Sequence, residues 1–149
     1  MRSSDCRKLA KAILGNVIVR SECIGENLYF NINSDAVLES VKSLSSNAAT
    51  LFSTLTDCFA VDFLKQKERF SIFYQLHSYK IARSIFIMTD IRKDEKMQSV
   101  TTVFENANWY EREIFDMFGI EFHDHPDMRR ILTLNSEGMF PLRKISNIS

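Results

Sequence analysis

The sequence predicts an α+β domain with two layers, in which a mostly antiparallel or mixed sheet is covered by helices. Two adjacent segments within residues 69–90 alternate apolar and polar side chains as paired strands do. Residues 3–14 and 100–118 instead place apolar side chains at helical spacing. Residues 134–149 lose all periodicity. We therefore predict a single domain over residues 1–133, followed by an extended C-terminal arm over residues 134–149.

Composition narrows the class of protein. A chain of 149 residues is expected to form one domain with its own core. Lys plus Arg and Asp plus Glu number 19 each, which argues against general nucleic-acid binding because that needs a basic surface. Cys6, Cys23 and Cys58 are far apart, which argues against an iron–sulfur cluster, a structural zinc or a disulfide framework and favours free buried thiols. No apolar run approaches the ~20 residues of a membrane-spanning helix, so any membrane association is expected to go through a partner.

The first third of the chain predicts a helix, a strand pair and a second helix. Residues 3–5 are expected to cap a short helix that ends at Gly15 and Asn16. Residues 17–19 and 28–32 are predicted strands that could form a hairpin. Ser34 and Asp35 are then expected to cap a helix over residues 37–44, since apolar residues follow at helical spacing.

The clearest β-hairpin joins residues 70–77 to residues 81–88 through a turn at 78–80. Both segments carry apolar side chains on both faces near their middles, which is typical of central strands in a covered sheet. The charged run 92–96 is predicted to be a solvated loop without function.

A long amphipathic helix is predicted from Val100 to Phe118. Gly119 follows it, where a left-handed cap costs little. Asn106 and Asn108 are weak helix formers, so the helix could bend or begin late there. Its predicted apolar stripe consists of Val100, Val103, Phe104, Ala107, Tyr110, Ile114, Met117 and Phe118.

Two residues break this pattern. Glu111 falls inside the apolar stripe, where a carboxylate must find hydrogen-bond donors or change its protonation. Arg129 and Arg130 could return to meet it; alternatively, the helix breaks at Asn108 and Glu111 is solvated. Trp109 falls on the opposite, charged side, which suggests a partner surface, although a loop of the same chain could cover it.

The histidines and carboxylates of this region are the candidates for chemistry. His123 and His125 would share one side of an extended segment, so a metal site, and with it a small metal-dependent hydrolase, is conceivable. The alternative is a turn in which Pro126 fixes one dihedral angle and Asp127 accepts hydrogen bonds. The carboxylates of Glu111, Glu113 and Asp116 lie on different helical faces and do not converge for acid–base catalysis. The chain has no G-x-G-x-x-G or G-x-x-x-x-G-K-[ST] motif, so it is not expected to bind NADH or flavin, and no catalytic or metal-binding residues are predicted.

Four short elements occur in order along this region: Glu111-Arg112-Glu113, Asp116-Met117-Phe118-Gly119, His125-Pro126-Asp127 and Arg129-Arg130-Ile131-Leu132. Together they resemble the signature of the C subunit of NADH-quinone oxidoreductase, respiratory complex I. A weaker resemblance covers Phe52, Leu55 and residues 60–62. The sequence departs from the family at Asp124, where the family has Gly and where Asp tolerates a left-handed backbone, and after Pro141–Lys144, where the family's longer arm is replaced by a short tail.

The resemblance implies a non-catalytic peripheral-arm subunit of a proton-translocating NADH:quinone oxidoreductase, which passes electrons from NADH through iron–sulfur clusters to quinone. It implies docking against the large quinone-site subunit and the small iron–sulfur subunits, with FMN, the clusters, NADH and quinone bound by other subunits. It also implies a peripheral position on the cytoplasmic face of a bacterial inner membrane, or on the matrix face in mitochondria. The alternative is the equivalent subunit of a related membrane-bound hydrogenase or other cluster-containing dehydrogenase.

The signature residues are the expected docking residues. We predict that Glu111, Arg112, Glu113, Asp116, Arg129 and Arg130 form a charge network that sets the geometry of the helix and the following turn. The full set that the resemblance assigns to partner docking is Trp109, Glu111, Arg112, Glu113, Asp116, Gly119, His125, Pro126, Asp127, Arg129 and Arg130.

Overall fold

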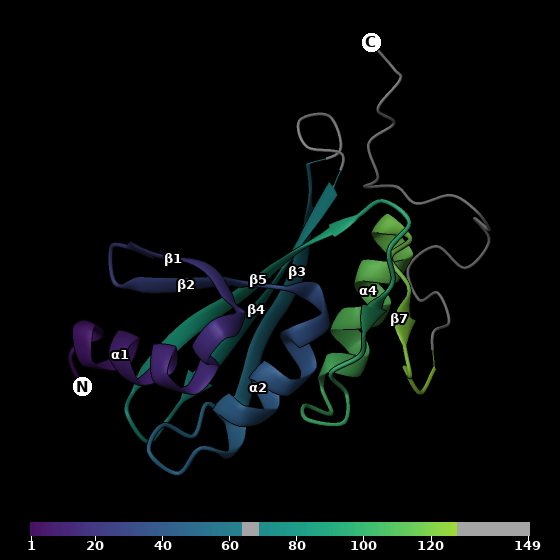
Figure 1. Ribbon diagram of the computed structural model, residues 1–149. Helices are drawn as coiled ribbons and strands as arrows, with labels where there is room; N and C mark the ends of the chain where they lie inside the picture. The colour runs from purple at the N-terminus through teal and green to yellow at the C-terminus, as the bar shows by residue number, and fades with distance from the viewer. Residues whose placement is uncertain (64–68, 128–149) are drawn as a thin grey trace.

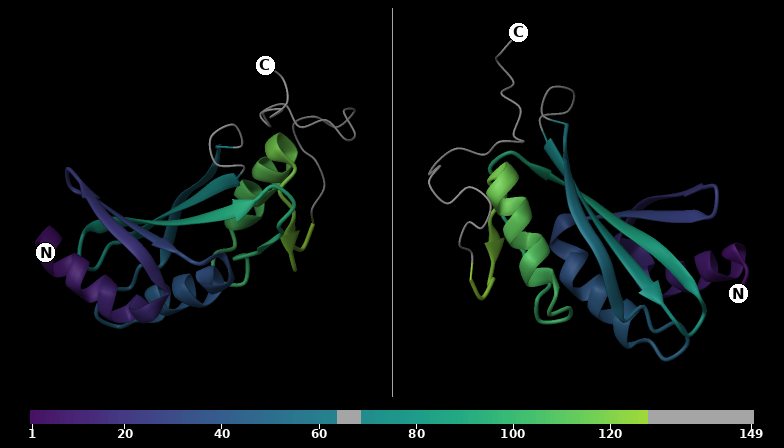
Figure 2. Two further views of the ribbon diagram at one scale, coloured as in Figure 1. Left: turned by 45° about the horizontal axis from the view of Figure 1, so that its top comes forward. Right: turned by 180° about the vertical axis from the view of Figure 1, so that it is seen from behind.

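A computed structural model describes residues 1–63 and 69–127 of the chain. It has a five-stranded sheet in the order β1-β2-β5-β4-β3 and a separate two-stranded sheet, β6-β7. The helices lie on one side of the larger sheet, which confirms the predicted two-layer α+β fold (Figures 1 and 2). The strands are β1 (Ile18–Ile24), β2 (Asn27–Ile32), β3 (Thr54–Asp62), β4 (Arg69–Ser78), β5 (Arg83–Arg92), β6 (Met97–Gln98) and β7 (Phe122–His123), and the helices are α1 (Ser3–Leu14), α2 (Val37–Ser46) and α4 (Ala107–Phe118).

The pairing of the strands makes the sheet mixed. β1 and β2 form the predicted antiparallel hairpin, and β4 and β5 form the second one at the centre of the sheet. β2 pairs with β5 in parallel, with Leu28 opposite Ile85. β3, which the sequence did not predict, pairs antiparallel with β4, and its register shifts between Leu55 and Asp57. That irregularity interrupts the alternation by which a strand is recognised.

The predicted N-terminal caps of the first two helices were wrong. α1 begins at Ser3, with Arg2 as the N-cap residue and no side-chain cap, so residues 3–5 lie inside the helix. Ser34 lies in a short 3-10 turn over Ser34–Ala36, and its hydroxyl donates to the Glu95 carboxylate (Oγ–Oε2 2.7 Å) instead of capping α2. The end of α1 is as predicted, because Gly15 adopts a positive φ of 62° immediately after Leu14.

The long helix begins late, at the asparagines where the sequence allowed a late start. α4 begins at Ala107, and residues 100–106 form successive turns in which the amides of Val103 and Phe104 both donate to the Val100 carbonyl. Five of the eight stripe residues are nevertheless buried and the other three are partly buried, because these turns keep Val100 and Phe104 on the same side as Ile114. α4 packs beside β3, where the Asn106 amide donates to the Leu55 carbonyl at 2.8 Å and the Tyr110 hydroxyl donates to the Thr56 carbonyl at 3.1 Å.

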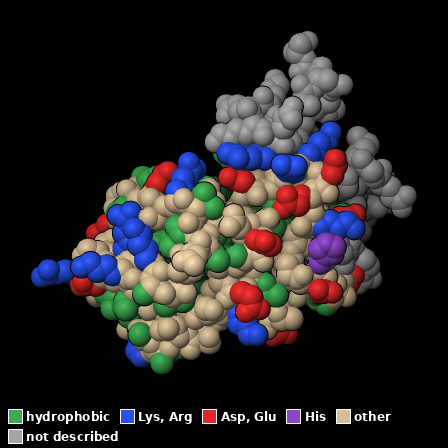
Figure 3. All heavy atoms as spheres, in the orientation of Figure 1, with side chains coloured by type: hydrophobic (Ala, Val, Ile, Leu, Met, Phe, Trp, Pro, Cys, Tyr) green, Lys and Arg blue, Asp and Glu red, His purple; other side chains and the backbone are tan. Residues whose placement is uncertain are grey.

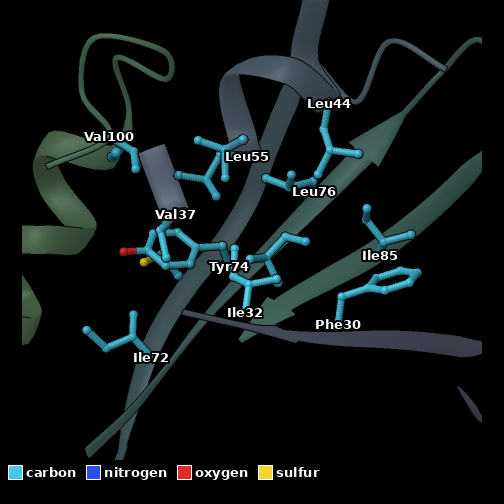
Figure 4. Packing of buried hydrophobic residues seen from close by; sticks show 14 of the residues in the cluster. Phe30, Ile32, Val37, Leu44, Leu55, Ile72, Tyr74, Leu76, Ile85 and Val100 are labelled. Carbon is cyan, nitrogen blue, oxygen red and sulfur yellow. The ribbon is translucent and has the colours of Figure 1, made fainter. Parts of the chain in front are cut away.

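The core lies between the sheet and the helices. Figure 4 shows Phe30, Ile72, Leu76 and Ile85 among its members and the Tyr74 hydroxyl directed toward α4. The opposite face of the sheet carries two stacked aromatic pairs, Tyr29–Phe86 and Phe59–Phe73, with ring centroids 4.6 and 5.0 Å apart. A shallow apolar groove of about 330 Å³ opens on that face, lined in part by Tyr29, Phe73 and Met88.

The cysteines only partly follow the prediction of buried free thiols. All three are free, and Cys6 and Cys58 are buried, but Cys23 is exposed near the tip of the β1–β2 hairpin. Among the described residues, none of the helices is both long and apolar enough to cross a bilayer.

Candidate functional site: a buried carboxyl group and an exposed tryptophan

Three segments meet around the middle of α4. β6 and the loop that follows it are held against the segment around β7 by two backbone hydrogen bonds, from the Met97 amide to the Glu121 carbonyl and from the Ser99 amide to the His123 carbonyl, both 2.9 Å. α4 runs alongside both segments in Figure 1. We call Glu111, Ser99, Thr101 and His125, which lie where these segments meet, the Glu111 cluster.

Glu111 is completely buried, as its place in the apolar stripe predicted. Both of its oxygens accept hydrogen bonds: Oε1 from the Ser99 hydroxyl at 2.6 Å and Oε2 from the Val100 backbone amide at 2.9 Å. The alternative of a solvated Glu111 was therefore wrong. Both donors precede α4 in the chain, whereas the arginines predicted to meet Glu111, Arg129 and Arg130, lie outside the described residues.

Burial controls the ionisation of this carboxyl group. Removal from water raises the pKa of Glu111 from its ordinary value of 4.5 to about 7, while the hydrogen bonds from Ser99 and Val100 act in the opposite direction. Two neutral groups lie nearby on the sheet. Burial raises the pKa values of Cys58 and Tyr74 well above their ordinary values, and the Glu111 charge adds to both shifts. The Tyr74 hydroxyl makes no hydrogen bond within the described part of the chain.

His125 is held in one orientation by the turn that contains it. Its Nδ1 accepts a hydrogen bond from the Asp127 amide at 2.9 Å, so in the neutral ring the proton is on Nε2. Nε2 lies 3.1 Å from the Asn108 carbonyl and 3.9 Å from Glu111 Oε1. Asp124 has a φ of 61°, so the left-handed backbone expected at this departure from the family is present.

The arrangement around the two histidines is that of a turn. His123 is exposed, whereas the His125 side chain is buried and bonded to the backbone. Within residues 1–63 and 69–127, no three His, Cys, Asp or Glu side chains are grouped as metal ligands would be. The carboxylates do not converge either, because Glu111 is buried beside Ser99 while Glu113 lies at the surface beside Trp109.

Trp109 lies on the other side of α4 and is 52% exposed. Its indole N–H donates to Glu113 Oε1 at 2.8 Å, which fixes the orientation of the ring on the helix surface. Among residues 1–63 and 69–127, no loop buries it. Figure 3 shows acidic and basic side chains interspersed over the displayed face of the protein.

Of the remaining signature residues, Asp116 departs from its predicted place and Gly119 does not. Asp116, expected on the charged side, is completely buried. Gly119 ends α4 with a φ of 76°, and its amide donates to the Phe115 carbonyl at 2.8 Å, as the predicted cap requires. Arg112 is partly exposed.

Sequence reasoning missed Ser99 and Thr101, whose hydroxyls complete the cluster. Ser99 is twelve residues before Glu111, so no helical or strand spacing relates them. The one available signal is the polar pair that flanks the apolar Val100 at the predicted start of the helix, because Ser and Thr are weak helix formers.

Comparison with known proteins identifies the family. Residues 30–149 match the family described as "Respiratory-chain NADH dehydrogenase, 30 Kd subunit". The C subunit of NADH-quinone oxidoreductase from Roseobacter denitrificans is 39% identical over 139 residues, which cover 88% of this chain and 70% of that protein. The same subunits of Ruegeria pomeroyi and Rickettsia bellii are 40% and 35% identical, covering 84% and 89% of this chain and 66% and 68% of those proteins.

A solved structure has the same fold. It is a chain in the "Structure of the membrane-bound sulfane sulfur reductase (MBS), an archaeal respiratory membrane complex", with a TM-score of 0.74 over 93% of this chain and 84% of that chain, at 22% sequence identity. The family match and the three bacterial relatives confirm the resemblance seen in the signature residues. The chain therefore belongs to the respiratory-chain NADH dehydrogenase 30 Kd subunit family, which is the family of the C subunit of NADH-quinone oxidoreductase.

Proposed function

We propose that this protein is a non-catalytic peripheral-arm subunit of a proton-translocating NADH:quinone oxidoreductase. The observation that carries the proposal is the family match over residues 30–149, together with relatives named as the C subunit of NADH-quinone oxidoreductase. In this role the chain helps to assemble the arm that passes electrons from NADH through iron–sulfur clusters to quinone. FMN, the clusters, NADH and quinone are held by other subunits.

The partners that we propose are the large quinone-site subunit and the small iron–sulfur subunits. The complex would hold the chain at the cytoplasmic face of a bacterial inner membrane, or at the matrix face in mitochondria. Trp109 is the docking anchor that the geometry supports best, because it is half exposed and its ring is already oriented by Glu113. Large aromatic side chains held in one orientation bind a partner with little further loss of entropy.

We further propose that the predicted charge network has two parts with different roles. Glu111 joins α4 to the loop before it and thereby supports the fold. Glu113 orients Trp109 at the surface and thereby supports docking. The contribution of Arg129 and Arg130 remains the hypothesis drawn from the sequence, and Arg130→Ala is expected to loosen assembly.

The first experiment is affinity purification of the tagged chain from detergent-solubilised host membranes, followed by an NADH:quinone assay of the eluate. Co-elution of a large, cluster-bearing, NADH-oxidising assembly would support the proposal. Co-elution of a hydrogen-oxidising assembly would favour the alternative, a membrane-bound hydrogenase or related dehydrogenase. A bare monomer that lacks partners would contradict both.

The docking surface is tested in the same preparation. Trp109→Ala is expected to reduce recovery of partner subunits while leaving the unfolding free energy within about 0.5 kcal/mol of wild type, since the side chain is at the surface. Tyr79→Ala is the matched control, because Tyr79 is an exposed aromatic residue (77%) in the turn after β4, away from α4. Equal recovery of partners with both variants would refute the assignment of Trp109.

A further inference from the structure

The hydrogen bonds of the Glu111 cluster continue beyond the carboxyl group toward solvent. The Ser99 hydroxyl lies 2.6 Å from Glu111 Oε1 and 2.8 Å from the Thr101 hydroxyl, and in the second contact either atom can be the donor. Glu111 is fully buried and Ser99 is 2% exposed, whereas Thr101 is partly exposed. Two hydroxyl groups thus connect a buried carboxyl group to the surface.

This chain of hydrogen bonds accommodates either charge state of Glu111 with the same positions of the heavy atoms. With Glu111 ionised, Thr101 donates to Ser99 and Ser99 donates to Oε1. With Glu111 protonated on Oε1, that proton is donated to Ser99, whose own proton turns toward Thr101. Oε2 accepts from the Val100 amide in both states, whereas a proton on Oε1 has the Ser99 oxygen as its acceptor. The Thr101 amide, 3.2 Å from Ser99 Oγ, holds the serine oxygen in place.

We propose that Glu111, Ser99 and Thr101 form a proton-binding site in which the buried carboxyl group exchanges a proton with solvent through the two hydroxyl groups. On uptake, a hydronium ion gives a proton to Thr101 Oγ1, Thr101 passes its own proton to Ser99, and Ser99 passes its own to Glu111 Oε1. Three O–H bonds form and three break, with one water molecule released. Release of the proton is the reverse sequence.

The surroundings suit a site of this kind. The titratable groups that face Glu111 from the elements packed on it, within the described chain, are Cys58 on β3, Tyr74 on β4 and His125 after β7. Cys58 and Tyr74 stay neutral because burial raises their pKa values well above the ordinary ones. His125 directs its Nε2 proton to the Asn108 carbonyl. The raised pKa of Glu111, about 7, is consistent with proton exchange near neutral pH.

The test uses the purified full-length chain and infrared spectroscopy of its carboxyl groups across a pH titration. Wild type is expected to show one carboxylic-acid C=O band that persists above the range of ordinary carboxyl groups and disappears near pH 7. Glu111→Gln should lack this band, and the surface variant Glu113→Gln should retain it. A band that survives in Glu111→Gln, or wild type without such a band, would overturn the proposal.

The relay is tested with variants that keep the carboxyl group. Ser99→Ala removes a hydrogen bond that favours the ionised form, so the band should disappear at a higher pH than in wild type. Thr101→Val should leave the midpoint unchanged but slow the shift of the band after dilution into D₂O by about tenfold or more. Exchange as fast as in wild type in both variants would refute the relay. The inference does not depend on the proposed role in a respiratory complex, because every measurement uses the isolated chain.

Discussion

Glu111→Gln should change how the stability of the protein depends on pH. Glutamine keeps the size and shape of the side chain, and its carbonyl and amide groups can bond the Val100 amide and the Ser99 oxygen in place of the protonated acid. It cannot ionise. A comparison of the two proteins therefore isolates the cost of holding a charge at this buried position.

The size of the effect follows from the pKa shift. The pKa of Glu111 rises from 4.5 in the unfolded chain to about 7 in the folded protein, a difference of about 2.5 units (7 − 4.5). At about 1.4 kcal/mol per unit this amounts to roughly 3 kcal/mol. The folded state binds the proton more tightly, so the stabilising contribution is complete below pH 4.5 and is lost as the pH rises to about 7. Wild type should therefore lose roughly 3 kcal/mol relative to Glu111→Gln across this window.

The assay is urea unfolding of both proteins, followed by far-UV circular dichroism at a series of pH values. The quantity of interest is the unfolding free energy of wild type minus that of Glu111→Gln, because the contributions of the other titrating groups cancel in this difference. It is expected to fall as the pH rises. A difference that stays flat within about 0.5 kcal/mol would refute the raised pKa. A difference that rises with pH would mean that a cation stabilises the charged form, which would favour the pairing with Arg129 or Arg130 that the sequence suggested.

Three further substitutions test the packing around this site. Tyr74→Phe should stabilise the protein by about 1 kcal/mol, because it removes a buried hydroxyl group that has no partner among the described residues; destabilisation in urea unfolding would show that this group is bonded. Leu76→Ala should cost about 2–5 kcal/mol by the same measurement, since Leu76 is fully buried at the centre of the sheet, and a loss below 1 kcal/mol would contradict that burial. Gly119→Ala should lower the thermal midpoint and cost about 1–2 kcal/mol, because a residue with a Cβ is strained at a φ of 76°; an unchanged midpoint would count against the left-handed cap.

The features that the sequence predicted correctly are those encoded by residues close together in the chain. Alternation over residues 70–77 and 81–88 identified the central hairpin, because β4 and β5 are regular and each has one face buried in the core. The burial of Glu111 followed from helical spacing within α4, and the left-handed cap followed from Gly119 alone. Each of these inferences depends on geometry within one element.

The features that were missed depend on contacts between distant segments. β3 was not recognised because the irregularity between Leu55 and Asp57 shifts its side chains out of alternation. The parallel pairing of β2 with β5 joins residues nearly sixty positions apart, such as Leu28 and Ile85, and no local pattern specifies that register. The donors Ser99 and Val100 were missed for the same reason, since a serine hydroxyl and a backbone amide near a turn have no distinctive sequence signal.

Glu111 and Trp109 are two positions apart on one helix, and their contacts together determine how α4 is presented to a partner. The bonds from Ser99 and Val100 to Glu111 fix the rotation of α4 about its axis relative to the loop before it. Trp109 lies on the opposite side, so the same bonds determine the direction in which the indole ring faces. If Trp109 docks as proposed, a buried residue that touches no partner would therefore control docking through the helix.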